Sequence, residues 1–207
     1  MYPLLETILL KDGLFYNVHY HADRMHRSVR ALLGKDLRFS LYEMLSAVNY
    51  PNSGIYKCRI TYSFDVWEIA FHPYTYPLIT HLQMVVADNL DYSLKYADRK
   101  GLLDLKNQFG KGEEVMIIRN GWVTDTSFSN IIYRQGNQWL TPAHPLLKGT
   151  QRQYLLDAGI LAERDITAMD ILQCDELALV NAMIDFEHRI RIHKVLNLSQ
   201  RAPTSQV

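Results

Sequence analysis

The chain has 207 residues, 48% of them hydrophobic, and its 22 Lys and Arg side chains balance its 22 Asp and Glu side chains. This length and apolar content allow a sizeable core, in one large domain or two small ones, and exclude disorder as the default. A chain without net charge or a basic stripe does not predict a nucleic-acid or membrane-surface ligand.

The compartment follows from the N-terminus and the cysteines. The start of the chain has no basic segment followed by a small-residue cleavage site, and no apolar run approaches the roughly 20 residues of a membrane span. Cys58 and Cys174 lie far apart in apolar segments, which favours reduced, buried thiols over a disulfide or a metal site. We therefore expect a soluble, cytoplasmic protein.

The first third of the sequence predicts a compact α+β unit. Asp12-Gly13 tolerates the positive φ angles of a tight hairpin turn, and Gly34 is placed to end a helix. The expected elements in chain order are strands at 5–10 and 14–20, a helix at 20–34, a weaker helix at 40–50, and paired strands at 55–63 and 66–72. Residues 72–81 read as a linker, so we place a boundary near 74–80 and expect a small α+β domain at 1–76.

The remainder, 77–207, is expected to form a larger mixed α/β domain. Turns are predicted at Asn120-Gly121 and Gly136-Asn137. The expected elements are a strand at 82–88, a helix at 97–109, strands at 113–123 and 129–142, helices at 148–159 and 166–173, and a buried strand at 175–183. The polar tail, 201–207, is expected to be frayed.

Several common chemistries lack their signals. His19, His21 and His26 cluster, with His19 and His21 expected to alternate on a strand, but no further ligands are signalled nearby for a metal. The chain has no G-x-S-x-G segment of a hydrolase, no Walker loop and no G-x-G-x-x-G. A metal centre, a serine hydrolase and a nucleotide site are therefore disfavoured.

Four pieces in a fixed order carry a stronger signal. They are HADRMHRS at 21–28, LKYADR at 94–99, VTDTSFSNIIY at 123–133 with TPAHPLLKGTQR at 141–152, and DELALVNAM at 175–183. Together these pieces resemble the fold-type-IV pyridoxal-phosphate enzymes, the superfamily of branched-chain aminotransferase, D-amino-acid aminotransferase and 4-amino-4-deoxychorismate lyase. The resemblance covers almost the whole chain and implies a two-domain α+β fold, a pyridoxal 5'-phosphate cofactor and a homodimer.

The resemblance also implies roles for particular residues. Its H-x-x-R-[ML]-x-x-S helix places a phosphate-binding arginine at Arg24, and its K-x-x-x-[RN] segment places the cofactor-linked lysine at Lys95. Its V-[TS]-E-x-x-x-x-N segment places the carboxylate that faces the pyridine nitrogen at Asp125. The remaining implied cofactor contacts are Asn130, which closes that segment, the helix start Gly149, Thr150 and Gln151, with Arg152 completing the motif, and the later turn at Asn181 and Ala182.

These residue types suit those roles physically. A buried carboxylate such as Asp125 keeps the ring nitrogen protonated, which the cofactor needs to stabilise a carbanion. A lysine nucleophile must be partly neutral, and Lys95 lies beside the basic pair Arg99-Lys100. A helix opening at Gly149 presents free amides to a phosphate, to which Arg24 can add a bidentate contact.

Each residue alone also has a structural interpretation. Arg24 could be a solvated helix arginine, Lys95 a surface lysine, Asp125 a turn cap and Gly149-Thr150 a simple helix start. The order and spacing of the pieces favour the cofactor site.

The chain departs from the family pattern in three ways. Where the family has a glutamate, this chain has Asp125, whose side chain is shorter. The threonine of the G-[IV]-T-R helix start is replaced by Gln151. The chain also begins almost at the L-[FL]-E-T strand, so we expect a truncated N-terminal domain. These departures leave loss of activity or a changed substrate open.

The lysine segment and the Asn-Ala pair of 181–182 look more like the lyases than the branched-chain aminotransferases. An aminodeoxychorismate lyase-like enzyme is therefore favoured, which eliminates pyruvate from 4-amino-4-deoxychorismate to give 4-aminobenzoate for folate synthesis. The alternatives are a class IV aminotransferase of a small or branched-chain amino acid, and a homologue without catalysis.

Overall fold

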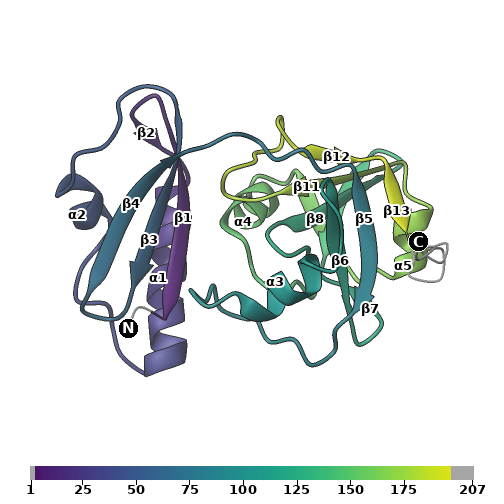
Figure 1. The fold of residues 1–207 in the computed structure, drawn as a ribbon, viewed down its shortest axis with the longest axis horizontal. Coiled ribbons are helices and arrows are strands. Elements are labelled where there is room, and N and C mark those ends of the chain that lie inside the picture. The colour runs from purple at the N-terminus through teal and green to yellow at the C-terminus, as the bar shows by residue number, and fades with distance from the viewer. Residues whose placement is uncertain (1–2, 197–207) are drawn as a thin grey trace, which may run out of the picture.

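The computed structural model describes residues 3–196, and the polar tail lies outside them. Figure 1 shows two groups of elements side by side, one from the first 73 residues and one from the rest. Residues 74–80 contain no helix or strand and join the two groups. The division into domains at residues 76 and 77 stays a prediction.

The N-terminal group is one antiparallel sheet with two helices. The strands pair in the order β2-β1-β3-β4, and long helix α1 contacts β1. Its elements are β1 (Leu4–Lys11), β2 (Leu14–Phe15), α1 (Val18–Leu33), α2 (Leu41–Ser46), β3 (Ile55–Tyr62) and β4 (Trp67–Pro73). Met25 and Val29 of α1 pack on Ile8 and Ile60 of the sheet, all at 0% exposure, and these contacts fix which face of α1 meets β1.

The predicted turns of this group are confirmed. Asp12 and Gly13 both have positive φ, 49° and 79°, as a tight hairpin turn requires, and Gly34 ends α1 at φ 63°. The expectation that His19 and His21 alternate on a strand is wrong. Asn17 takes a left-handed conformation at φ 56° and starts the helix at Val18, so both histidines lie in α1.

The C-terminal group contains two further sheets that share a core. One sheet has the order β10-β9-β8-β11-β12 and the other β13-β5-β6-β7. Its strands are β5 (His81–Val86), β6 (Glu113–Arg119), β7 (Trp122–Val123), β8 (Asn130–Gln135), β9 (Gln138–Pro142), β10 (Leu161–Arg164), β11 (Glu176–Val180), β12 (Ile190–Ile192) and β13 (Lys194–Leu196), and its helices are α3 (Lys100–Lys106), α4 (Thr150–Asp157) and α5 (Ala168–Leu172). Leu82 and Met116 from one sheet pack in the same cluster as Ile131 and Leu179 from the other.

The sequence predicted the longer elements of this group and missed β10, β12 and β13. These strands have three or four residues each, and β10 buries only Leu161, so no period-2 pattern marks it. They form because neighbouring strands offer free edges: β10 runs parallel to β9, and β13 runs parallel to β5. Long-range pairing of this kind leaves little local signal.

Two smaller expectations have clear outcomes. Cys58 and Cys174 are free thiols, and Cys58 is fully buried while Cys174 is only partly buried. No helix within residues 3–196 combines the length and apolar character needed to cross a membrane.

Candidate active site

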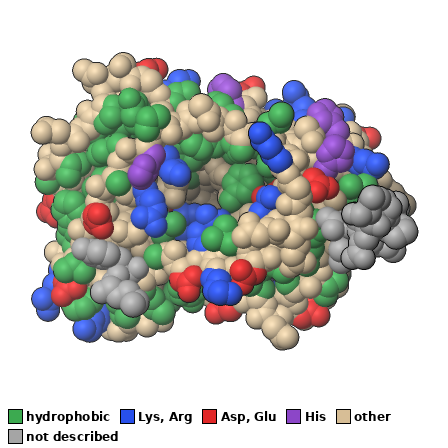
Figure 2. Space-filling view, viewed as in Figure 1, with side chains coloured by type: hydrophobic (Ala, Val, Ile, Leu, Met, Phe, Trp, Pro, Cys, Tyr) green, Lys and Arg blue, Asp and Glu red, His purple; other side chains and the backbone are tan. Residues whose placement is uncertain are grey.

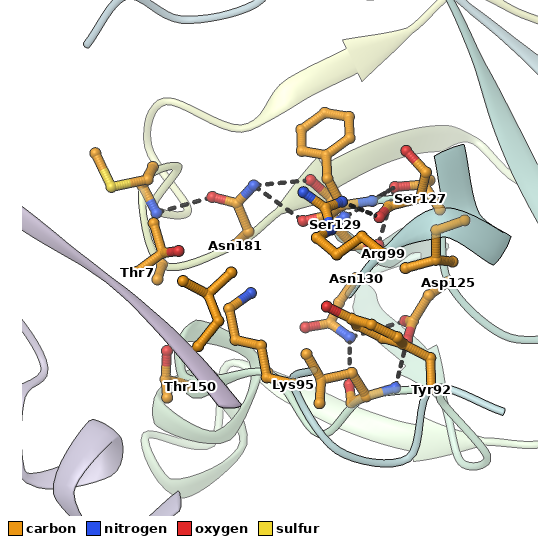
Figure 3. A pocket seen from close by; sticks show the side chains of 18 of the residues that line it. Thr7, Tyr92, Lys95, Arg99, Asp125, Ser127, Ser129, Asn130, Thr150 and Asn181 are labelled. Carbon is orange, nitrogen blue, oxygen red and sulfur yellow. Dashed lines mark hydrogen bonds between the residues drawn. The ribbon is translucent and has the colours of Figure 1, made fainter. Parts of the chain in front are cut away.

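One cavity of about 410 Å³ lies between the two groups of elements. Figure 2 shows Lys and Arg side chains gathered in and around this hollow. It is lined by Arg24 from α1, by Lys95, by Asp125 and Asn130, by Gly149 and Thr150 at the start of α4, and by Asn181 and Ala182 after β11. The fold thus brings most of the predicted residues, from four separate sequence pieces, to one cavity. Figure 3 shows Lys95, Asp125, Asn130, Thr150 and Asn181 among them.

Lys95 is held in place by backbone pairing with β1. The segment between β5 and α3 returns to the edge of that strand, where Leu5 N donates to Lys95 O at 2.9 Å and Tyr96 bridges to Leu4. This pairing directs Lys95 into the space between β1 and the opposite wall (Figure 3). An isolated β-bridge between two distant segments, which the sequence did not predict, therefore sets the position of Lys95.

The surroundings of Lys95 favour its neutral form. Burial, together with the positive charges of Arg24 and Arg99 and opposed by the carboxylate of Glu6, lowers the pKa of Lys95 to about 7. An amine with such a pKa is substantially neutral near pH 7, whereas an ordinary lysine is almost wholly protonated. Lys95 is therefore a competent nucleophile.

Asp125 lies on the facing wall in an extended segment after β7. Its backbone carbonyl accepts from Ile117 N at 2.9 Å, which aligns the segment with β6. Its carboxylate accepts from Asn130 Nδ2 and from Leu147 N, both at 2.8 Å. Burial raises the pKa of Asp125 to about 6 against these hydrogen bonds, so the carboxyl is poised to gain from a cationic partner.

Asn130 joins the carboxylate to the loop before α4. Besides Asp125, its Nδ2 donates to Leu147 O at 2.9 Å. A Cβ placed on Gly149 would lie 1.9 Å from Asn130 Oδ1, so only glycine permits this approach. Asn130 and Gly149, separate signals in the sequence, are one packing unit in the structure.

The start of α4 presents an anion-binding arrangement. Gly149 is the N-cap and has no side-chain capping bond, so the first amides of the helix are available to a ligand. Thr150 lines the cavity at the start of α4, and Arg24, which is 6% exposed, lines the same cavity from α1. Donors and positive charge converge here as a phosphate requires.

Gln151 is the predicted site residue whose side chain does not line the cavity. Its Oε1 accepts from Asn17 Nδ2 at 2.8 Å and so ties α4 to the start of α1. The following Arg152 is also turned away, since its guanidinium donates to Pro142 O and to Glu163. Neither Gln151 nor Arg152 is therefore part of the cavity lining.

Asn181 and Ala182 lie in the turn after β11. Asn181 Nδ2 donates to Ser129 Oγ at 3.0 Å, and Asn181 Oδ1 accepts from Met183 N at 2.8 Å. Figure 3 shows the bond between Asn181 and Ser129, which holds the turn against the segment just before β8. The predicted site residues Asn181 and Ala182 are thus linked to the segment that carries Asp125.

Sequence reasoning missed several lining residues. Lys57 and Arg59 project from β3 into the cavity, and their spacing of two in a strand was the available signal for a shared face. Arg99 lines the cavity while donating to Ser127 O at 2.7 Å. Thr7 on β1 and Tyr92 complete the polar wall.

Within residues 3–196 no three His, Cys, Asp or Glu side chains converge in a way that would hold a metal ion. His21 is instead bonded to Glu6 in the core, while His19 and His26 are exposed on α1. Helix α1 buries His21 and leaves His19 and His26 exposed, so the three histidines that are close in the sequence do not form a cluster in the structure.

Comparisons with known proteins agree with this geometry. Residues 3–186 match the family described as amino-transferase class IV. An uncharacterized protein of Haemophilus influenzae is 40% identical over 185 residues, which cover 88% of this chain and 98% of that protein. The crystal structure of a candidate 4-amino-4-deoxychorismate lyase from Haemophilus somnus 129PT superimposes with a TM-score of 0.82 at 38% identity, over 88% of this chain and 97% of that one. A hypothetical aminotransferase from Mycobacterium tuberculosis, in its PLP-bound form, shares the fold with a TM-score of 0.74 at 18% identity, over 93% of this chain and 81% of that one.

Proposed function

The chain belongs to the class IV aminotransferase family, and from this premise we propose that it is a pyridoxal-phosphate enzyme that eliminates pyruvate from 4-amino-4-deoxychorismate. The observation that carries the proposal is the cavity in which Lys95 and Asp125 occupy opposite walls. The similarity to a candidate lyase over nearly its whole length supports this reaction.

The lining fits the cofactor group by group. Asp125 offers a buried carboxylate to a protonated pyridine nitrogen. Burial disfavours the charge of Asp125 and raises its pKa, so a cation beside it would stabilise the carboxylate. Arg24 and the amides at Gly149-Thr150 offer donors to the phosphate. When bound, the cofactor supplies an electron sink for a substrate carbanion.

The residues of the chain then have distinct tasks. Lys95 Nζ, with a pKa of about 7, holds or releases a proton near neutral pH, so it can take the proton from the substrate carbon that bears the amino group and return one later. Asp125 keeps the proton on the ring nitrogen. Asn130 orients Asp125 through its hydrogen bond.

The charges in the cavity favour a substrate with more than one carboxylate. Lys57 and Arg59 are partly buried and have no carboxylate partner among the described residues, and Arg99 donates to the carbonyl oxygen of Ser127. Asp125 is the acidic side chain in the described lining. The two carboxylates of 4-amino-4-deoxychorismate would balance these charges, whereas a branched-chain amino acid has one.

The test begins with the lysine. Borohydride reduction of the protein with its cofactor, followed by peptide mapping, is expected to place the pyridoxyl group on Lys95. Lys100, five residues later and exposed, is the internal control. Labelling of Lys100 or Lys148, or no labelling, would refute the assignment.

The reaction is tested separately by product. Incubation with 4-amino-4-deoxychorismate is expected to release 4-aminobenzoate and pyruvate, and Lys57→Met and Arg59→Met are expected to raise KM more than they lower kcat. Keto-acid formation from amino acids, without 4-aminobenzoate, would identify an aminotransferase instead. Neither product with a labelled Lys95 would identify a cofactor-binding homologue without these activities.

A further inference from the structure

Behind Arg24 and Thr150, which line the cavity, lie two buried polar side chains, Glu6 and His21, that the proposed chemistry does not use. Glu6 of β1 is fully buried and accepts from Arg24 Nε at 2.8 Å and from His21 Nδ1 at 2.6 Å. On its other side, His21 Nε2 lies 3.3 Å from the hydroxyl of Thr150. The Glu6 carboxylate thus connects to the start of α4 through His21, and it also holds Arg24, which lines the cavity.

The hydrogen-bond directions in this network can be assigned. Burial alone would raise the pKa of Glu6, but the charge and hydrogen bonds of Arg24 and His21 lower it to about 2, so Glu6 is an acceptor only. His21 Nδ1 must therefore carry a hydrogen. In neutral His21, Nε2 is an acceptor, and the Thr150 hydroxyl is the group that donates to it.

That direction is wrong for holding an anion. A Thr150 hydroxyl that donates to His21 turns its lone pairs toward the cavity and cannot donate to a phosphate. If His21 gains a proton, Nε2–H donates to Thr150 Oγ1, and the hydroxyl hydrogen is released toward the cavity. Gln151 cannot supply a hydroxyl in place of Thr150, because it carries none and its side chain is directed to Asn17.

We propose that His21 takes up a proton when an anion occupies the start of α4, with Glu6 as its buried counter-ion, so that Thr150 becomes a donor to the anion. This inference rests on the proposed function only in identifying the natural anion as the cofactor phosphate. Glu6 and His21 are positioning residues in this scheme, since they act through Arg24 and Thr150.

The charges around His21 agree with such a coupling. In the free protein, burial lowers the pKa of His21, the carboxylate of Glu6 opposes this, and the charges of Arg24 and Lys95 lower it further. From α4 the group that faces His21 is the uncharged Thr150. A doubly charged anion placed in this buried setting offsets both positive charges and favours the imidazolium.

The decisive measurement is the ¹⁵N chemical shift of the His21 ring nitrogens, titrated with pH in the presence and absence of sulfate. Sulfate is the probe because its own charge stays constant across the titration. We expect saturating sulfate to raise the pKa of His21 by at least one unit, while His19 and His26, exposed on the same helix, shift little. A His21 that stays neutral, or moves no more than these two, overturns the proposal, as does the absence of saturable sulfate binding.

Sulfate affinity gives a second readout that separates His21 from Lys95, whose amine faces the same cavity. In the wild type the affinity should fall by up to tenfold per pH unit as the pH rises from the pKa of free His21 to the higher pKa of sulfate-bound His21, and should level off above it. Lys95→Met should keep a pH dependence, whereas His21→Gln should weaken it. Loss of the dependence in Lys95→Met alone would assign the proton to Lys95 and refute the role of His21.

Three further variants test the network without disturbing its packing. Thr150→Val should uncouple the His21 shift from sulfate, and Thr150→Ser should restore it. Glu6→Gln should leave His21 neutral with sulfate bound and weaken sulfate at least tenfold. Because none of these readouts needs a bound cofactor, a failed sulfate titration with Lys95 still labelled by borohydride refutes this inference alone.

Discussion

Replacing Lys95 by methionine is expected to stabilise the cofactor-free protein. Methionine keeps most of the aliphatic length of lysine and removes an amine whose charge is disfavoured by its surroundings. The lowering of the pKa of Lys95 from 10.5 to about 7 corresponds to about 5 kcal/mol, because each pKa unit is worth about 1.4 kcal/mol. Part of the side chain is accessible from the cavity, so we discount this for screening by solvent to about 2 kcal/mol.

The sign depends on pH in a defined way. Between pH 7 and 10.5 the unfolded chain holds the Lys95 proton and the folded protein does not, so wild-type stability rises with pH through this window. Lys95→Met lacks that dependence. Its advantage should be largest at or below pH 7 and should shrink toward zero as pH approaches 10.5.

Thermal unfolding at a series of pH values is the assay. A gain of about 2 kcal/mol should raise the Tm of Lys95→Met by roughly 4 to 8 °C at pH 7 for a protein of this size. The matched control is Lys57→Met, which also alters a cavity-lining lysine, but one on a regular strand. A Tm for Lys95→Met at or below the wild-type value at pH 7, or a gain that persists at pH 10.5, would show that Lys95 is not destabilised by its site.

Three other predictions follow from the site and the family. Gly149→Ala must displace Asn130, so we expect about 1 to 3 kcal/mol lower stability and weaker cofactor binding, by thermal unfolding and absorbance titration, whereas Gly101→Ala in α3 meets only a leucine side chain and should be tolerated. With a confirmed substrate, Asp125→Asn should lower kcat about ten- to a hundredfold, since a buried charged hydrogen bond is worth about 1.5 to 3 kcal/mol, and Asp125→Glu should retain activity; unchanged turnover in Asp125→Asn would reduce the carboxylate to a structural cap. We also propose a homodimer with the cavity near its interface, so light scattering at micromolar concentration should give twice the chain mass, and a monomer that still binds cofactor would contradict this.

The chain covers 97% of the Haemophilus somnus structure but 81% of the Mycobacterium tuberculosis one, so it is shorter than some members of the fold. In this chain β1 supplies the backbone partner for the Lys95 segment.

Much of the fold and the site could be predicted from the sequence because their signals are local. Asp12-Gly13 is a typical sequence of a tight turn and Gly34 of a helix end, and all three residues have the positive φ angles that these roles require. The spacing of Lys95 and Asp125 within recognisable segments predicted residues that prove to line one cavity. Residue type and short-range spacing were sufficient in these cases.

Tertiary structure decided what depends on contacts between distant segments. In the sequence, Lys57 and Arg59 belong to one face of a strand with alternating side chains. Only the packing of the two groups of elements shows that this face lines the same cavity as Lys95. Glu6 and His21 looked like separate polar residues until β1 and α1 closed over them and made them partners at 2.6 Å. The pKa values that give Lys95 and Asp125 their chemistry come from burial and neighbouring charge, which exist only once the chain has folded.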